Sequence, residues 1–315
     1  MKKLLSTLAA FSLVVSASVW AKYPDKPITL IVPWGAGGGT DTVARIVAKG
    51  MQEELGVRIN VINRAGGSGV TGHSAIANAK PDGYTLGVIT SEIALMHHKG
   101  MTDLTYKDFT FITRTATVDG GVQVAKDSKF KSISDLLAYA KAHPGELKAS
   151  GSGLNSIWHI NCMGMLESAG ISRDAIRFIP SQGASSGLQE LVSGSVDMTT
   201  SATGEAQSMV SAGLVKNLVI MTDGPSKIYP DIPVFKEVTG HNWQLGTWHT
   251  IGAPKGLSQE KQDILLNALN RAFSTGELKT LIRKRGFELS PLSGDKLMNF
   301  LEEEDQKFGK ILAEK

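Results

Sequence analysis

The residues best suited to chemistry form a glycine-rich loop, Gly35 to Asp41, between an apolar β-branched segment (28–32) and a helical pattern. A helix N-terminus presents unpaired backbone N–H groups and the positive end of the helix dipole. A carboxylate can therefore approach Gly38, Gly39 and Thr40 closely. A phosphate-binding P-loop requires a lysine after its glycines, and this loop has none. Asp41 would also repel a polyphosphate. A turn that only lets the helix pack on the sheet is equally compatible with this loop.

A second loop, Ser150 to Ser156, also precedes a helical pattern and contains hydroxyl groups, an amide and open backbone N–H groups. Such groups are suited to hydrogen-bonding a carboxylate. The alternative is an ordinary capping loop with Ser156 as N-cap, and the two roles are compatible. The two loops together favour a carboxylate-binding site more strongly than either loop alone.

The segment Gly67 to Gly72 matches the dinucleotide fingerprint G-x-G-x-x-G and follows a strand-like segment. Glu92, after the next predicted strand, stands where such a site needs an acid for the ribose. The N-terminus predicts export from the cytoplasm, as described below, and free nicotinamide cofactors are scarce outside it, which argues against this interpretation. We interpret the glycine run as loop geometry and expect no cofactor.

Nucleophilic and metal chemistry find little support in the sequence. There is no His-Glu-x-x-His and no His or Cys spacing typical of zinc. His97 and His98 are adjacent, so on a helix they would not share a face. Cys162 fits a small core residue, and His159 fits a structural histidine as well as a ligand contact. We expect no catalytic residue and no metal.

The expected elements alternate between strands and helices, which favours a parallel α/β sheet. Thr40 or Asp41 is placed to cap the first helix, and Ser132 with Asp135 has capping-box spacing. The C-terminal helix, 293–312, has an apolar face, and its run of acids, 302–305, is predicted to be solvated. Predicted strands are 28–32, 58–61, 84–89, 196–199 and 218–221; further predicted helices are 132–143, 187–192, 204–212 and 258–274.

The N-terminus has two lysines, an apolar stretch and a small residue at position 21, as in a secretory signal peptide (1–21). No cysteine follows it, so a lipoprotein is not expected. The one cysteine excludes an intrachain disulfide. Without Lys2 and Lys3 the chain is close to neutral, which gives no case for nucleic acid or a membrane surface as partner. The remaining length suits two lobes, and the absence of a flexible linker implies that ordered chain connects them.

Several short motifs occur in order along the chain. They are Tyr23-Pro24-x-Lys26-Pro27-Ile28, Val32-Pro33-x-x-x-Gly37-Gly38-Gly39-Thr40-Asp41, Asn63-Arg64, Pro81-Asp82-Gly83-Tyr84-Thr85-Leu86, Pro180-x-x-Gly183, Val196-Asp197, Pro230-Asp231-Ile232-Pro233, the Trp248 region and Ala253-Pro254-x-Gly256. This ordered set resembles the Bug or tripartite tricarboxylate transporter receptor family. The similarity runs from Tyr23 to the C-terminus.

The resemblance implies an α/β fold of the type II periplasmic binding protein class, with two lobes joined by two crossing strands and a ligand cleft between them. We expect residues 22–120 plus 247–315 in the first lobe and 121–246 in the second. The resemblance also implies a small carboxylate ligand and a transporter with one large and one small membrane subunit. A periplasmic location and a monomer are expected. A periplasmic sensor or enzyme acting on a small carboxylate is the alternative.

Carried over position by position, the resemblance nominates fourteen ligand-binding residues. Relatives often carry charge or an aromatic at the positions of Gln182 and of 200–202, which puts the ligand's identity in doubt. Aromatic side chains near both loops, Trp34 and Trp158, offer apolar walls. The nominated residues are Trp34, Gly38, Gly39, Thr40, Asp41, Thr90, Ser91, Ser152, Asn155, Ser156, Gln182, Gly183, Ser201 and Trp248.

Overall fold

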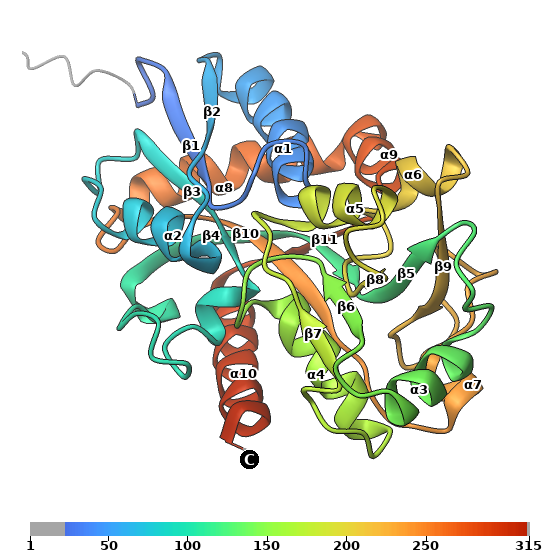
Figure 1. Ribbon diagram of the computed structural model, residues 1–315. Coiled ribbons are helices and arrows are strands. Elements are labelled where there is room, and N and C mark those ends of the chain that lie inside the picture. Colours follow the sequence, from blue (N-terminus) through green and yellow to red (C-terminus); the bar gives the residue numbers. More distant parts are fainter. Residues whose placement is uncertain (1–22, 314–315) are drawn as a thin grey trace, which may run out of the picture.

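The computed structural model describes residues 23–313 and consists of two α/β lobes, each built on its own sheet (Figure 1). The expected signal peptide, 1–21, lies outside the described residues. Within 23–313, no helix has the length and apolar character that a membrane crossing requires.

The first lobe contains a six-stranded mixed sheet in the order β11-β4-β10-β3-β1-β2. β1 pairs with β2 and β3 in parallel, as the alternating pattern predicts, whereas β10 is antiparallel to β3 and to β4. Four of the five β1 residues are buried, which explains the unbroken apolar run. The strands are β1 (Ile28–Val32), β2 (Ile59–Asn63), β3 (Thr85–Thr90), β4 (Phe109–Asp119), β10 (Gly246–Pro254) and β11 (Glu288–Leu292).

The second lobe contains a five-stranded sheet in the order β7-β6-β8-β5-β9. β6 is parallel to β7 and β8, and β5 is antiparallel to β8 and β9. The strands are β5 (Gly121–Ala125), β6 (Leu147–Ser150), β7 (Ile176–Phe178), β8 (Met198–Thr199) and β9 (Val215–Ile220).

Helices cover both sheets. The capping box of Ser132 and Asp135 is confirmed at the start of α3. The predicted helix over 204–212 is shorter than expected, because only the five residues of α6 are helical. The helices are α1 (Gly39–Leu55), α2 (Val70–Ala77), α3 (Ile133–Ala142), α4 (Ile157–Ser168), α5 (Ala184–Val192), α6 (Gln207–Ser211), α7 (Phe235–Thr239), α8 (Gln259–Ser274), α9 (Gly276–Lys284) and α10 (Gly294–Ala313), with short 3-10 turns η1 (Gly67–Gly69), η2 (Ser91–Ala94) and η3 (Tyr106–Asp108).

Two segments carry the chain between the sheets as ordered structure. β4 ends at Asp119 and β5 begins at Gly121, while β10 returns to the first sheet at Gly246. The Gly120 N–H donates to the Leu245 carbonyl at 2.9 Å, so the two crossings are bonded to each other. A Cβ at either Gly120 or Gly246 would lie 2.6 Å from a backbone oxygen. Only glycine fits there, which fixes how closely the crossings approach.

The acidic run on α10 is only partly solvated, contrary to the sequence prediction. Glu302 and Glu303 are exposed, but Glu304 accepts a hydrogen bond from the Trp248 indole at 3.0 Å, and Asp305 faces two histidines. Residues 304 and 305 follow buried Leu301 by about one turn, so they share the inward face of the helix.

Candidate functional site

A cavity of about 200 Å³ lies where the two lobes face each other. α1 and α5, which come from different lobes, lie side by side (Figure 1), and residues of both helices line the cavity. The nominated residues that line it are Trp34, Gly38, Gly39, Thr40, Thr90, Ser152, Gln182 and Gly183. Trp158, which the sequence indicated as an apolar wall, lines it too. Further lining residues were not indicated by the sequence, among them Glu92, Ser185, Ser186, Gln189, Glu205, Thr247 and His249.

The first glycine loop delivers the N-terminus of α1 to the cavity. The N-cap is Gly38, so the prediction that Thr40 or Asp41 caps this helix is wrong. Both residues lie inside the first turn. The Asp41 carboxylate instead accepts from the Gly37 N–H at 2.9 Å and from Arg45 at 3.0 Å, which holds the loop in shape. These bonds outweigh burial and keep the pKa of Asp41 below its usual value.

Glu205, which reaches this N-terminus from the other lobe, is a site residue that the sequence did not indicate. Its Oε1 accepts the Gly39 N–H at 2.9 Å, and its Oε2 accepts the Ala202 N–H at 3.3 Å. The side chain is partly exposed on the cavity wall. Desolvation raises the pKa of Glu205 to about 7, and the nearby charge of Glu92 adds to the rise. Its only sequence signal is an acid among small residues (202–206).

The second loop brings the N-terminus of α4 to the same cavity. Ser156 is the N-cap, as predicted, but its hydroxyl donates to the Gly153 carbonyl at 2.6 Å and contacts Ser152 instead of capping the helix. Glu92, from the first lobe, interacts with the backbone N–H of Ile157, the first residue of α4. Burial nevertheless raises the pKa of Glu92. A carboxyl group of the protein thus faces each of the helix N-termini that the two loops present.

The N-terminus of α5 is the third helix end at the cavity. Gly183 is its N-cap with φ 146°, a conformation that favours glycine, and Gln182, Ser185 and Ser186 line the wall around it. No acidic residue lies in its first turn, and no side chain caps it. α1 has Asp41 in its first turn and donates to Glu205 from the other lobe, and α4 faces Glu92, whereas the first turn of α5 has no acid and offers its first backbone N–H groups to a ligand.

Hydrogen bonds behind the wall fix the polar side chains that line it. The Thr40 hydroxyl lies 3.1 Å from His249 Nε2, and burial lowers the pKa of His249 to about 4. The Trp34 indole donates to the Thr90 hydroxyl at 3.3 Å. His73 accepts the Thr90 N–H at 3.1 Å and donates from Nδ1 to the Gly69 carbonyl at 2.8 Å. Because His73 Nε2 accepts the Thr90 N–H while Nδ1 donates, this imidazole is neutral.

Six nominated residues do not line the cavity. Asp41, Ser91 and Ser156 are buried just behind it; Ser91, for example, bonds the lining residue Thr247 at 2.5 Å. The other three have partners outside the lining residues: Asn155 donates its N–H to His159 at 3.0 Å, Ser201 donates to Gln123 at 2.9 Å, and the Trp248 indole donates to Glu304.

The Trp248 side chain lies away from the cavity, because β10 turns it to the far face of the sheet. There it packs edge-on against Phe300, with ring centroids 5.7 Å apart. The neighbouring residues Thr247 and His249 point to the cavity instead, as the alternation of a strand requires. Trp158, beside the second loop, supplies the aromatic wall in its place.

The glycine run 67–72 serves packing, in agreement with its interpretation as loop geometry. A Cβ at Gly72 would collide with the backbone of Pro33, at the end of β1. Ser68 donates to the Leu154 carbonyl at 2.7 Å, which adds a contact between the lobes. Cys162 is buried, and burial raises its pKa to about 12, as for an unreactive core thiol.

The charge of the cavity is set by Glu92 and Glu205, because no lysine or arginine is among its described lining residues. Burial raises the pKa values of both carboxyls, and the charge of Glu92 adds to the rise at Glu205. An anion in this cavity must therefore be held by helix N-termini, hydroxyls and amides.

Comparisons with known proteins agree with this architecture. Protein BugT of Bordetella pertussis is 28% identical over 322 residues, spanning 100% of this chain and 98% of that protein. The structure of MatC from Rhodopseudomonas palustris with bound malate is 26% identical, with a TM-score of 0.83 over 92% of this chain and 100% of its own. An R. palustris protein solved with adipate is 27% identical, with a TM-score of 0.85 over 92% and 97%.

The sequence model described as "Tripartite tricarboxylate transporter family receptor" matches residues 43–315, from the first helix to the end of the chain. Together with the two-lobe fold and the cavity between the lobes, this match establishes that the chain belongs to the tripartite tricarboxylate transporter receptor family.

Proposed function

We propose that this protein is an extracytoplasmic receptor that captures a small organic acid and delivers it to the large and small membrane subunits of a tripartite tricarboxylate-type transporter. The observation that carries the proposal is that α1 and α5, from opposite lobes, direct their N-termini to one cavity. Each N-terminus favours negative charge. A ligand that is bound at the α5 N-terminus and also contacts the α1 loop would draw the lobes together.

The carboxylate is expected at the first turn of α5, where Ser185 and Ser186 add hydroxyl groups to the backbone N–H groups. The α1 and α4 N-termini already face Glu205 and Glu92. Of the nominated residues, we retain as ligand contacts those that line the cavity: Trp34, Gly38, Gly39, Thr40, Thr90, Ser152, Gln182 and Gly183.

The size of the cavity supports a small ligand. Its volume of about 200 Å³ is below the roughly 300–1,000 Å³ typical of pockets for drug-sized molecules. Two structural relatives were solved with malate and with adipate. Trp34 and Trp158 supply apolar walls for the carbon skeleton.

We assign residues 22–120 plus 247–315 to one lobe and 121–246 to the other, with the crossings at Gly120 and Gly246 as the hinge. The protein is expected to be exported to the periplasm through a cleaved signal peptide, to act as a monomer and to perform no catalysis.

Ligand binding can be tested directly with the purified mature protein. C4 to C8 dicarboxylates, citrate and aromatic acids are added while tryptophan fluorescence and the melting temperature are recorded. A ligand at 100 times its Kd stabilises the folded state by about 2.7 kcal/mol, so the cognate acid raises the melting temperature. Trp34 and Trp158 report the filling of the cavity. No response to any organic acid would refute carboxylate capture.

Delivery is tested separately in cells that express the receptor with or without the two membrane subunits. Uptake of the radiolabelled cognate acid is expected to require all three proteins. If the receptor binds the acid but uptake does not depend on the membrane subunits, the carboxylate site stands and the transport role is refuted.

A further inference from the structure

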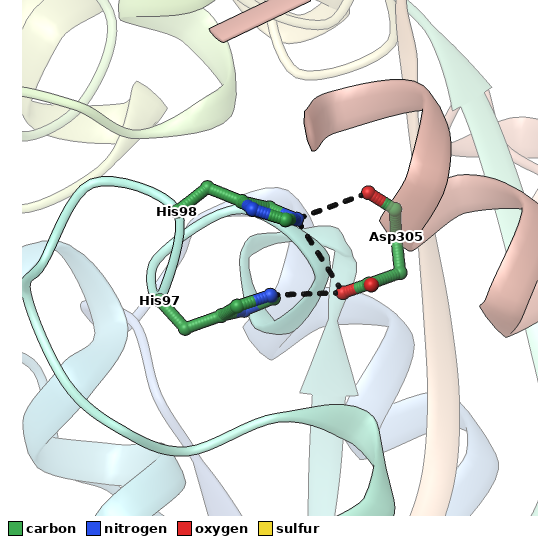
Figure 2. Close-up of side chains that lie close together, drawn as sticks. All are labelled: His97, His98 and Asp305. Carbon is green, nitrogen blue, oxygen red and sulfur yellow. Dashed lines mark hydrogen bonds and ion pairs between the residues drawn. The ribbon is translucent and has the colours of Figure 1, made fainter. Parts of the chain in front are cut away.

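Outside the cavity, two adjacent histidines and an aspartate distant in sequence come together on the first lobe (Figure 2). His97 and His98 lie in the turn that follows η2, and Asp305 lies on α10. Because this segment is a turn and not a helix, the two imidazole rings lie side by side, with centroids 3.9 Å apart. The expectation that adjacent histidines diverge therefore does not apply.

The separations of the three donor atoms suit a metal ion. His97 Nε2 and His98 Nε2 lie 3.1 Å and 3.7 Å from Asp305 Oδ1, and all three donors lie within 4.8 Å of one another. Zinc binds imidazole nitrogen and carboxylate oxygen at about 2.0–2.2 Å, so tetrahedral ligands stand roughly 3.3–3.5 Å apart. The observed distances bracket that value.

Hydrogen bonding does not account for the arrangement. Asp305 Oδ1 is buried and makes no hydrogen bond, although His97 Nε2 is 3.1 Å away. His98 Nε2 lies 3.1 Å from the Asp305 carbonyl oxygen. A buried carboxylate oxygen without a hydrogen bond is costly. An ion between the rings and the carboxylate would satisfy it.

Gly309 makes room for the site. It lies four residues after Asp305 and thus on the same face of α10. A Cβ at this position would lie 3.0 Å from His98 Cε1. Glycine inside a helix costs about 1 kcal/mol relative to alanine, and here it allows the ring to lie against the helix.

We propose that His97, His98 and Asp305 form a binding site for a divalent transition-metal ion of the zinc class. Two imidazoles and one carboxylate suit Zn²⁺ and its neighbours, whereas Mg²⁺ and Ca²⁺ prefer sites made of oxygen alone. The three side chains are 19%, 28% and 23% exposed, which leaves an entry path and a position for water.

A bound ion would join α10 to the segment that begins at the cavity wall. Glu92, in η2, lines the cavity five residues before His97. On α10, Glu304 binds Trp248 of β10, whose neighbours Thr247 and His249 also line the cavity. The ion would therefore stabilise the first lobe and the wall that it contributes.

The site is tested with Zn²⁺ added to the metal-free chain, purified without a polyhistidine tag, in isothermal titration calorimetry. One equivalent is expected to bind and to raise the melting temperature. Asp305→Asn, which keeps the shape of the side chain, and the double variant His97→Ala/His98→Ala are each expected to weaken binding by about 10-fold or more. Glu302→Gln, an exposed carboxylate on the same helix, is the matched control and should bind as the wild type does.

Co²⁺ gives a second readout that is independent of protein stability. Bound Co²⁺ is expected to show visible d–d absorption in the wild type and in Glu302→Gln, but not in Asp305→Asn. Equal Zn²⁺ affinity in the wild type and the double histidine variant, or no Zn²⁺ binding by the wild type, would overturn the proposal. Neither result depends on whether the cavity binds a carboxylate.

Discussion

The backbone N–H of Gly39 donates to Oε1 of Glu205 at 2.9 Å, across the gap between the two lobes. The reverse relationship holds on the other side of the cavity, where Glu92 of the first lobe faces the α4 N-terminus of the second. Each lobe thus places a carboxyl group at a helix N-terminus of its partner lobe. These contacts favour lobe closure, but they also place negative charge where an anionic ligand must enter.

Carboxylate binding should strengthen as the pH falls. Because the pKa of Glu205 is raised to about 7, the carboxyl is mostly charged at pH 8 and mostly neutral at pH 6, and the charged form repels a ligand anion. Titrations of the cognate acid at both pH values, with the ligand fully ionised, test this. Glu205→Gln keeps an acceptor for Gly39 and should bind about tenfold tighter at pH 8, equivalent to about 1.4 kcal/mol. Glu237→Gln, an exposed acid of the same lobe, should behave as the wild type. Identical pH profiles for all three proteins would exclude this role of Glu205.

An acid placed in the first turn of α5 should separate helix stability from ligand binding. Ser185→Asp puts a negative charge at the helix N-terminus, which stabilises the helix by about 0.3–1 kcal/mol. The same charge would occupy the position proposed for the ligand carboxylate, so we expect an affinity loss of about tenfold or more without a lower melting temperature. Gln259→Asp makes the same change at the exposed start of α8 and should leave the affinity unchanged. An unaltered Kd for Ser185→Asp would place the ligand elsewhere.

Gly39→Ala should weaken both the fold and the closure of the lobes. The added Cβ would lie 2.5 Å from Glu205 Oε1 and from Phe287 Cζ. Such overpacking costs about 1–3 kcal/mol. Gly276 occupies the first position of α9 with no neighbour within 4 Å, so Gly276→Ala is a matched control without the clash. Urea unfolding of both variants measures the difference; equal stability would show that the close approach at Gly39 is unimportant.

Acid should destabilise the protein through its buried neutral histidines. Burial lowers the pKa of His73 from 6.5 to about 4, and the same holds for His159 and His249. The unfolded chain therefore takes up protons first, and the contribution of these groups is complete above pH 6.5 and is lost as the pH falls toward 4. His73→Gln should flatten the decline of the melting temperature between pH 7 and 5. His241→Gln, in the loop before β10, serves as control and should leave the slope unchanged.

Much of the fold could be predicted from the sequence because the signals are local. The apolar run 28–32 and the glycine loop after it define β1 and the start of α1 within a few residues. Ser132 and Asp135 define the start of α3 by their spacing alone. The same locality explains the error at Thr40 and Asp41: both are good capping residues, but the glycine before them already has the extended conformation of an N-cap.

The sequence by itself determined the two glycine loops, the alternating α/β pattern and the membership of this chain in its family, since these depend on neighbouring residues and ordered motifs. Only the tertiary structure decided that Glu205 bonds Gly39, 166 positions away, that Trp158 and not Trp248 lines the cavity, and that Asp305 meets His97 and His98. The physical reason is that these contacts depend on which way a strand faces and how the lobes meet. Packing of distant segments fixes both, and no local pattern encodes them.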